Sequence, residues 1–169
     1  DDAIKRAATV AGSKYVAFGA DMYGGGKIAA GPPEAMPLAN ALRADAPERR
    51  RRIAGALDAL RRESDKRNIG DRKRQAAVGF CFGGGNVLEL ARTGAELQAV
   101  ICLHGDLLTP LPAKPGDIKA AICAMHGASD PVVPKKDRDI FEAEMEACGA
   151  KWQMLVFGGL LHSFSEIES

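Results

Sequence analysis

The chain has 169 residues, enough to bury one core, and its 46% hydrophobic and 27% charged residues are typical of soluble globular proteins. A formal net charge of +1 gives no reason to expect nucleic acid or an anionic membrane as a partner. No apolar run approaches the roughly 20 residues that cross a bilayer, and Asp1–Arg6 lacks the apolar core of a signal peptide. Of the four cysteines, Cys102 and Cys123 lie in apolar runs, so we expect reduced thiols in a cytoplasmic protein.

The predicted elements alternate between helices and strands along the chain. A helix is expected over 2–10, then a short strand over 15–20 and a loop rich in Gly and Pro over 23–37. The next helix starts near Pro47, because its apolar residues recur at helical spacing. Further strands are predicted over 75–80, 97–103, 118–125 and 152–157, and further helices over 83–91 and 134–148. This alternation predicts an α/β fold with a largely parallel sheet.

The segment Gly79–Gly83 reads Gly-Phe-Cys-Phe-Gly and lies between a predicted strand and a predicted helix. This context is typical of a nucleophile elbow, in which a strained turn exposes the nucleophile and small residues let strand and helix approach. Cys81 would be that nucleophile, Gly79 and Gly83 would give the clearance, and the Phe82 N–H would face an oxyanion. Taken alone, a buried cysteine in a glycine-rich turn would look the same.

Two downstream residues could complete a catalytic group with Cys81. His162 follows the last predicted strand, where a general base can reach over the sheet, although it could equally be a surface histidine. Asp130 precedes a proline after an apolar strand, a pattern that is also typical of a simple turn. The three occur in the order nucleophile, acid, base, and each follows a predicted strand at the carboxyl edge, where doubly wound sheets build their sites. Three coincidences in that order are unexpected.

The motifs GFCFGG, HGASDPVVP and LLHSF together resemble the dienelactone hydrolase family of the α/β-hydrolase superfamily. YVAFGADMYG is similar to that family's strand before an Asp-x-Tyr-Gly loop. The resemblance runs from about residue 15 to 164. It implies a three-layer fold with a mostly parallel central sheet, and a triad of Cys81, His162 as base and Asp130 as the acid that orients it.

The chain departs from this family's pattern in two places. Nothing corresponds to the family's first strands, whose loop supplies a second oxyanion donor, and no closing helix follows. We therefore expect residues 1–169 to form a single α/β-hydrolase domain that is incomplete at both ends. Some members carry an Arg after His-Ser-Phe to hold the carboxylate of dienelactone, whereas Ser165 and Glu166 stand here. The resemblance thus implies ester hydrolysis in general more strongly than dienelactone hydrolysis.

The expected function is hydrolysis of small carboxylic esters or lactones through a covalent acyl-enzyme, with no metal and no organic cofactor. The alternative is a non-catalytic or redox-sensing binding protein with a reactive Cys81. No partner beyond the small-molecule substrate is expected, and the sequence leaves monomer or homodimer open. His104 and His126 also end predicted strands, but no Cys/His spacing resembles a zinc site. Each is expected to be a loop hydrogen-bonder, with His104 a distant candidate for a pocket wall.

Other patterns favour no second function. Gly24–Lys27 resembles a phosphate loop only superficially, because Asp21 stands at its first Gly position and Ile28 follows the Lys. The basic residues over 49–74 are interrupted by acidic ones and have no interleaved aromatics. They indicate a solvated helix face.

Overall fold

The computed structural model describes residues 2–165, and the chain divides into two compact units, Asp1–Arg74 and Gln75–Ser169. Each unit is treated by itself below. The expectation of one α/β-hydrolase domain over the whole chain stays a prediction. No helix among the described residues is both long and apolar enough to span a membrane.

The first unit contains three helices: α1 over Asp2–Ala11, α2 over Pro32–Ala44 and α3 over Ala46–Arg67. The predicted helices over 2–10 and from Pro47 are confirmed. The Asp45 side chain caps α3 by accepting a hydrogen bond from the Glu48 N–H at 3.0 Å. At the other end, Asn68 adopts a left-handed conformation with φ 53°, which stops the helix.

Helix α2 lies partly where a loop was predicted, so that part of the prediction is wrong. Its first two residues are prolines, which suit a first helical turn because their missing N–H groups have no partner there anyway. The Glu34 carboxylate accepts a hydrogen bond from the Ala30 N–H at 2.8 Å, just before the helix. A third proline, Pro37, lies inside the helix, where its missing N–H removes one i→i−4 bond, yet the helix continues to Ala44.

The strand predicted over 15–20 is also wrong, because this segment is irregular. Tyr15, Val16 and Phe18 are 69, 48 and 43% exposed. An apolar segment becomes a strand only where a neighbouring strand satisfies its backbone groups. The ladders of the described sheet all lie within the second unit.

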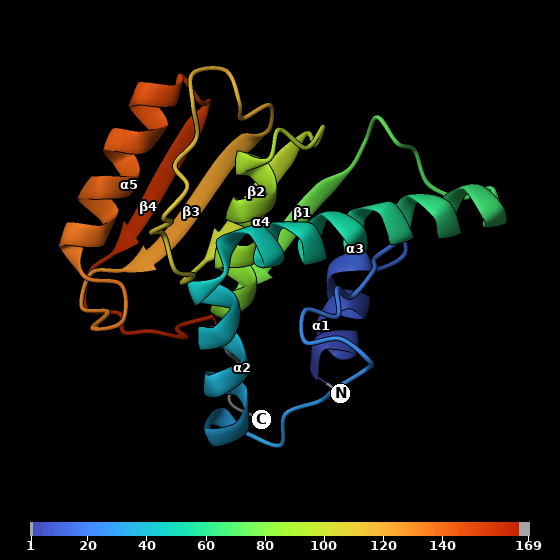
Figure 1. The fold of residues 1–169 in the computed structure, drawn as a ribbon, viewed down its shortest axis with the longest axis horizontal. Coiled ribbons are helices and arrows are strands. Elements are labelled where there is room, and N and C mark those ends of the chain that lie inside the picture. The colour runs from blue at the N-terminus through green and yellow to red at the C-terminus, as the bar shows by residue number, and fades with distance from the viewer. Residues whose placement is uncertain (1, 166–169) are drawn as a thin grey trace. The chain divides into compact units, whose positions relative to one another are not determined.

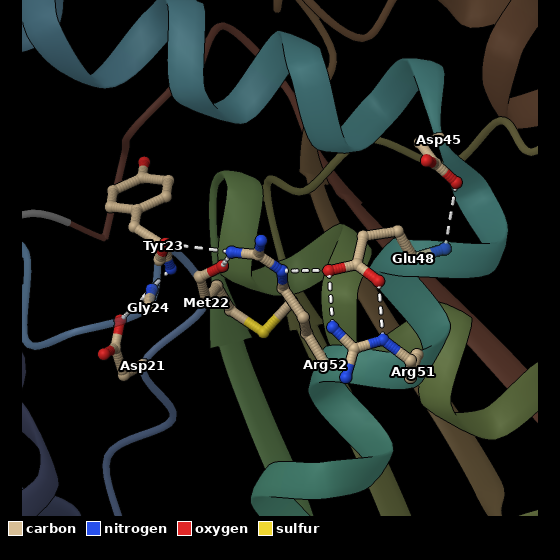
Figure 2. Close-up of polar contacts among 8 residues, drawn as sticks. All are labelled: Asp21, Met22, Tyr23, Gly24, Asp45, Glu48, Arg51 and Arg52. Carbon is tan, nitrogen blue, oxygen red and sulfur yellow. Dashed lines mark hydrogen bonds and ion pairs between the residues drawn. The ribbon is translucent and has the colours of Figure 1, made fainter.

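The loop that follows, over 21–26, is fixed from two sides (Figure 2). The Asp21 carboxylate accepts backbone N–H bonds from Tyr23, Gly24 and Gly26 at 2.7–3.1 Å. These bonds, with Gly26 first, lower the pKa of Asp21. Arg52 of α3 donates to the Met22 and Tyr23 carbonyls, each at 2.9 Å.

A carboxylate on α3 fixes that arginine in turn. Glu48 accepts hydrogen bonds from both Arg51 and Arg52, at 2.6–2.7 Å, and these bonds hold the pKa of Glu48 at about 2 (Figure 2). Arg52 therefore stays extended toward the loop. The Asp-x-Tyr-Gly segment is thus a well-ordered loop of the first unit.

The second unit is a four-stranded parallel sheet in the order β1-β2-β3-β4 (Figure 1). This confirms the predicted α/β fold with a parallel sheet. All six elements lie close to their predicted ranges, and β4 matches its range residue for residue. In chain order they are β1 (Ala76–Phe80), α4 (Phe82–Arg92), β2 (Ala99–Leu103), β3 (Ala121–Gly127), α5 (Lys135–Cys148) and β4 (Trp152–Phe157).

A buried charge network joins the two helices of this unit. Arg92 of α4 donates to both carboxylate oxygens of Glu144 on α5, at 2.9 and 2.7 Å, and also to Glu89 and to the Leu107 carbonyl. The side chains of Arg92 and Glu89 are 1% exposed. The pairing places α4 and α5 on the same face of the sheet, as right-handed β-α-β crossovers require.

Candidate active site

Cys81 occupies the sharp turn between β1 and α4, with φ 48° and ψ −122°. Its N–H continues the ladder to β2 by donating to the Leu103 carbonyl at 3.1 Å, while its carbonyl accepts the first helical bonds, from Gly84 and Gly85. A positive φ is strained for a residue with a Cβ. The turn is a nucleophile elbow in its geometry, and it presents the thiol at a helix N-terminus, where the helix dipole favours thiolate.

The elbow depends on glycines where backbones meet. A Cβ on Gly79 would lie 2.1 Å from the Gly83 carbonyl oxygen, and one on Gly84 would lie 2.9 Å from both Cys102 Sγ and Gly105 Cα. A Cβ on Gly83 would meet nothing within 4 Å. The expected clearance is therefore present at Gly79, but its second position is Gly84 in place of Gly83.

Asp130 and His162 are brought together by loops that follow β3 and β4. Asp130 Oδ2 lies 2.9 Å from His162 Nδ1, and Oδ1 accepts the N–H groups of Val132 and Val133. Burial alone would raise the pKa of Asp130, but the His162 and backbone hydrogen bonds outweigh it and leave the pKa below its ordinary value. A charged carboxylate thus receives Nδ1–H and leaves Nε2 of His162 as the nitrogen that can accept a proton.

The two loops are joined by their backbones. The Ala128 N–H donates to the Phe157 carbonyl at 2.8 Å, and the Ser129 N–H donates to the Leu160 carbonyl at 3.0 Å. Gly127 allows this approach, since a Cβ there would lie 2.2 Å from the Leu160 oxygen. The separation of Asp130 and His162 is therefore set by main-chain bonds as well as by their own hydrogen bond.

His104, expected to be a loop hydrogen-bonder or a distant pocket wall, lies against Cys81. Its ring is fully buried at the end of β2, with Nδ1 3.2 Å from Cys81 Sγ. Cys81, His104 and His162 each offer one possible metal-ligand atom, and these three atoms lie within 4.8 Å of one another. Ser163 Oγ is 3.5 Å from the same sulfur. The sequence signal for His104 is its place at the end of a predicted strand.

Backbone strain is concentrated around this cluster. In the described part of the chain, four non-glycine residues have positive φ, and three of them are Cys81, His104 and Ser163. Such conformations persist where the surrounding structure enforces them, and they gather at functional sites. Phe82 begins α4 directly after the nucleophile position. Its role as an oxyanion donor stays a prediction.

A third histidine, His126, lies buried near the cluster without a hydrogen-bond partner among the described residues for either ring nitrogen. Burial is the main reason that its pKa is lowered to about 4. The positive charge of Arg138 and the rings of His104 and His162 lower it further, against the opposing effect of Asp130. His126 is therefore neutral at physiological pH.

The buried neutral ring predicts acid sensitivity. Between about pH 6.5 and 4 the unfolded chain binds a proton at His126 that the folded chain excludes. The free energy of unfolding should therefore be unaffected by His126 above about pH 6.5. As the pH falls to about 4, it should decrease by up to about 3 kcal/mol. Urea unfolding across this range measures it. His126→Phe keeps a ring without titratable nitrogens and should flatten the dependence; an unchanged slope in this variant would contradict the assignment.

Comparisons with known proteins show which family the sequence resembles. The sequence profile of the dienelactone hydrolase family matches residues 2–169. The uncharacterized protein K02A2.1 of Caenorhabditis elegans is 35% identical over 123 residues, which are 70% of this chain and 73% of that protein. A putative carboxymethylenebutenolidase of Escherichia coli K12 is 29% identical over 107 residues. The match to this second protein covers 59% of this chain and 40% of the longer relative.

A solved structure is similar over nearly the whole chain. The dienelactone hydrolase-like promiscuous phosphotriesterase P91, from metagenomic libraries, is 36% identical with a TM-score of 0.85. That alignment covers 98% of this chain and 67% of P91. The α/β hydrolase MGS-M1, from a deep-sea metagenome library, has a TM-score of 0.57 at 21% identity, so the likeness concerns the fold alone.

Proposed function

The chain belongs to the dienelactone hydrolase family, and from this premise we propose that it hydrolyses small carboxylic esters or lactones with Cys81 as nucleophile. The observation that carries the proposal is the cluster at the sheet edge. A cysteine on a strained elbow lies close to a histidine whose other ring nitrogen is bonded to a buried aspartate. Nucleophile, base and orienting acid are the groups that acyl transfer through a covalent intermediate requires.

The proposed reaction begins with proton transfer from the Cys81 thiol to His162 Nε2. The thiolate attacks the carbonyl carbon, and the Phe82 N–H stabilises the resulting oxyanion, a contribution of about 3 kcal/mol for a typical donor. Collapse of the tetrahedral intermediate breaks the bond to the alcohol oxygen, which takes the proton from His162. Water then gives a proton to His162 and adds to the thioester carbonyl. The second tetrahedral intermediate collapses, which releases the carboxylic acid and the Cys81 thiolate, and His162 returns its proton to the sulfur.

Asp130 keeps the His162 ring in the tautomer that this mechanism needs. Its Oδ2 accepts Nδ1–H of His162, so Nε2 has the lone pair before each proton transfer and the imidazolium is stabilised after it. A thiolate is a good leaving group, so a tetrahedral adduct to an amide would expel sulfur before the poorer amine. Esters and lactones are therefore the substrate class that suits this nucleophile.

Replacing Cys81 with Ala is expected to abolish turnover of a nitrophenyl ester, because the proposed acyl intermediate forms on the Cys81 sulfur. Stopped-flow kinetics should show a burst of nitrophenol followed by steady release in the wild type and neither phase in the variant. Cys123→Ala is the matched control, since this half-buried thiol lies within β3 and away from the elbow. Retained turnover in Cys81→Ala would remove Cys81 from the role.

The same preparations test the alternative of a non-catalytic protein with a reactive cysteine. A thiol-reactive probe should label Cys81 in either case, because the alternative also gives this residue a reactive thiol. Labelling without ester turnover would favour a binding or redox-sensing protein. A burst whose amplitude equals the fraction of labelled Cys81 would favour the hydrolase.

A further inference from the structure

Three soft or borderline metal donors meet where the sequence showed no metal-binding spacing. Cys81 follows β1, His104 follows β2 and His162 follows β4, so the parallel sheet gathers them at one edge. One ligand atom from each lies within 4.8 Å of the others, and the sulfur is 3.2 Å from His104 Nδ1. Neighbouring ligands around tetrahedral zinc, with bonds of about 2.0–2.3 Å, are separated by about 3.3–3.8 Å. Small side-chain shifts would therefore suffice.

The hydrogen bonds on the far side of each ring leave a lone pair facing the cluster. His162 Nδ1 is bonded to Asp130, so Nε2 is the unprotonated nitrogen. His104 Nδ1 accepts a second, longer bond from the Cys81 N–H at 3.3 Å, so its Nε2 has the proton and donates to Ser165 Oγ at 2.7 Å. When zinc takes the Nδ1 lone pair, that N–H keeps its bond to the Leu103 carbonyl at 3.1 Å. Metal-binding histidines are typically held in this way, with the second nitrogen bonded to a carboxylate or another polar group.

The rings are also fixed by packing. The His104 ring lies edge-on to the rings of His162 and Phe164, with centroids 5.2 and 5.3 Å away. Its fully buried position and strained φ of 40° leave it little freedom to turn. The His162 side chain, in contrast, is 25% exposed, which gives an ion access from solvent. The cluster is thus preorganised on one side and open on the other.

We propose that Cys81, His104 and His162 form a zinc site whose occupation reversibly inhibits the enzyme. One thiolate and two imidazoles are a donor set that suits Zn²⁺ and disfavours Mg²⁺ or Ca²⁺, which take oxygen ligands. The ion replaces the thiol proton and leaves a fourth coordination position for water. Inhibition follows because the ion binds both the sulfur and the His162 nitrogen. The inhibition rests on the proposed function, whereas zinc binding does not.

Binding is tested first without substrate. Isothermal titration of the chelator-treated protein with zinc chloride should give one site per chain, and zinc should raise the melting temperature. Co²⁺ in place of zinc should give the near-ultraviolet charge-transfer band of a cobalt–thiolate bond. Binding of no zinc, or a cobalt spectrum without the sulfur band, would overturn the site.

Variants then assign the ligands. Ser165→Ala removes only the outer partner of His104 and should weaken zinc binding by about 10- to 100-fold. Cys81→Ser and His104→Phe remove a ligand and should weaken it further, with circular dichroism showing that each still folds. Cys123→Ala is the matched control and should bind zinc as the wild type does. Wild-type affinity in His104→Phe would overturn the three-ligand site, and a variant that fails to fold is replaced by His104→Leu.

Activity separates the two halves of the proposal. Zinc should stop ester turnover in the wild type, with half-inhibition at the zinc concentration that half-saturates the site in the calorimetric titration. EDTA should restore turnover. Zinc binding that needs Cys81 in a protein without turnover would leave the metal site in place and refute the hydrolase. Turnover that zinc leaves unchanged or raises, despite binding at Cys81, would overturn inhibition.

Discussion

Asp130→Asn is expected to lower kcat for ester turnover by about 10⁴-fold while leaving the fold intact, as the loss of the tautomer-setting carboxylate does in Ser-His-Asp triads. Oδ1 accepts two backbone N–H groups, which would retain the amide oxygen of Asn at that position. The amide NH₂ would then face His162 Nδ1 and donate to it. The ring would bear its proton on Nε2, the nitrogen that accepts the thiol proton in the proposed mechanism.

The measurement is kcat for a nitrophenyl ester together with the rate of Cys81 alkylation. Alkylation should slow as well, since the base that deprotonates the thiol is in the wrong tautomer. The matched control is Asp139→Asn, which removes an exposed carboxylate paired with Lys135 on α5. A kcat for Asp130→Asn within about tenfold of the control would show that Asp130 does not set the His162 tautomer.

Gly79→Ala is expected to lower the free energy of unfolding by about 3 kcal/mol or more and to reduce activity with it. The new methyl group would overlap the Gly83 carbonyl oxygen at 2.1 Å. Both atoms belong to backbone or its first carbon, so no side chain can turn away and the elbow itself must shift. Overpacking of this kind typically costs 1–3 kcal/mol, and more where backbone must move.

Gly83→Ala provides the matched control for that substitution. It adds the same methyl group four residues later, where nothing lies within 4 Å. Because Gly83 is inside α4, alanine should raise the free energy of unfolding by up to about 1 kcal/mol. Urea unfolding of both variants gives the comparison. Equal destabilisation by the two substitutions would mean that glycine flexibility, and not clearance, is what the elbow needs.

The second unit could be predicted well from the sequence because its strands are short apolar runs, each bounded by turn residues. The helices and strands over 75–157 could be recognised from local patterns of apolar residues. The first unit was harder. The run over 15–20 has the composition of a strand but no neighbour in its unit, and pairing is not a local property. Helix α2 differs from the prediction because Pro32, Pro33 and Pro37 favour a loop, although the first turn tolerates the first two and the helix continues past the third.

Of the candidate site, the sequence indicated the residues but not their contacts. The order of Cys81, Asp130 and His162 follows from motif and spacing. The contact of His104 with the sulfur depends on the register of β1 against β2, which places the ends of the two strands side by side. The need for Gly84 likewise arises from Gly105 and Cys102 on the neighbouring strand and its loop. Long-range packing of this kind leaves no local signal.

The bonds between Arg92 and the acidic side chains around it limit how far α4 can unwind. Unwinding α4 from its C-terminus would leave the buried guanidinium without Glu144 and the Leu107 carbonyl, and an uncompensated buried charge costs about 3–5 kcal/mol. The last turn of α4 therefore cannot fray independently of α5. The helix that begins at Phe82, directly after the proposed nucleophile, is thus fixed to α5 at its far end.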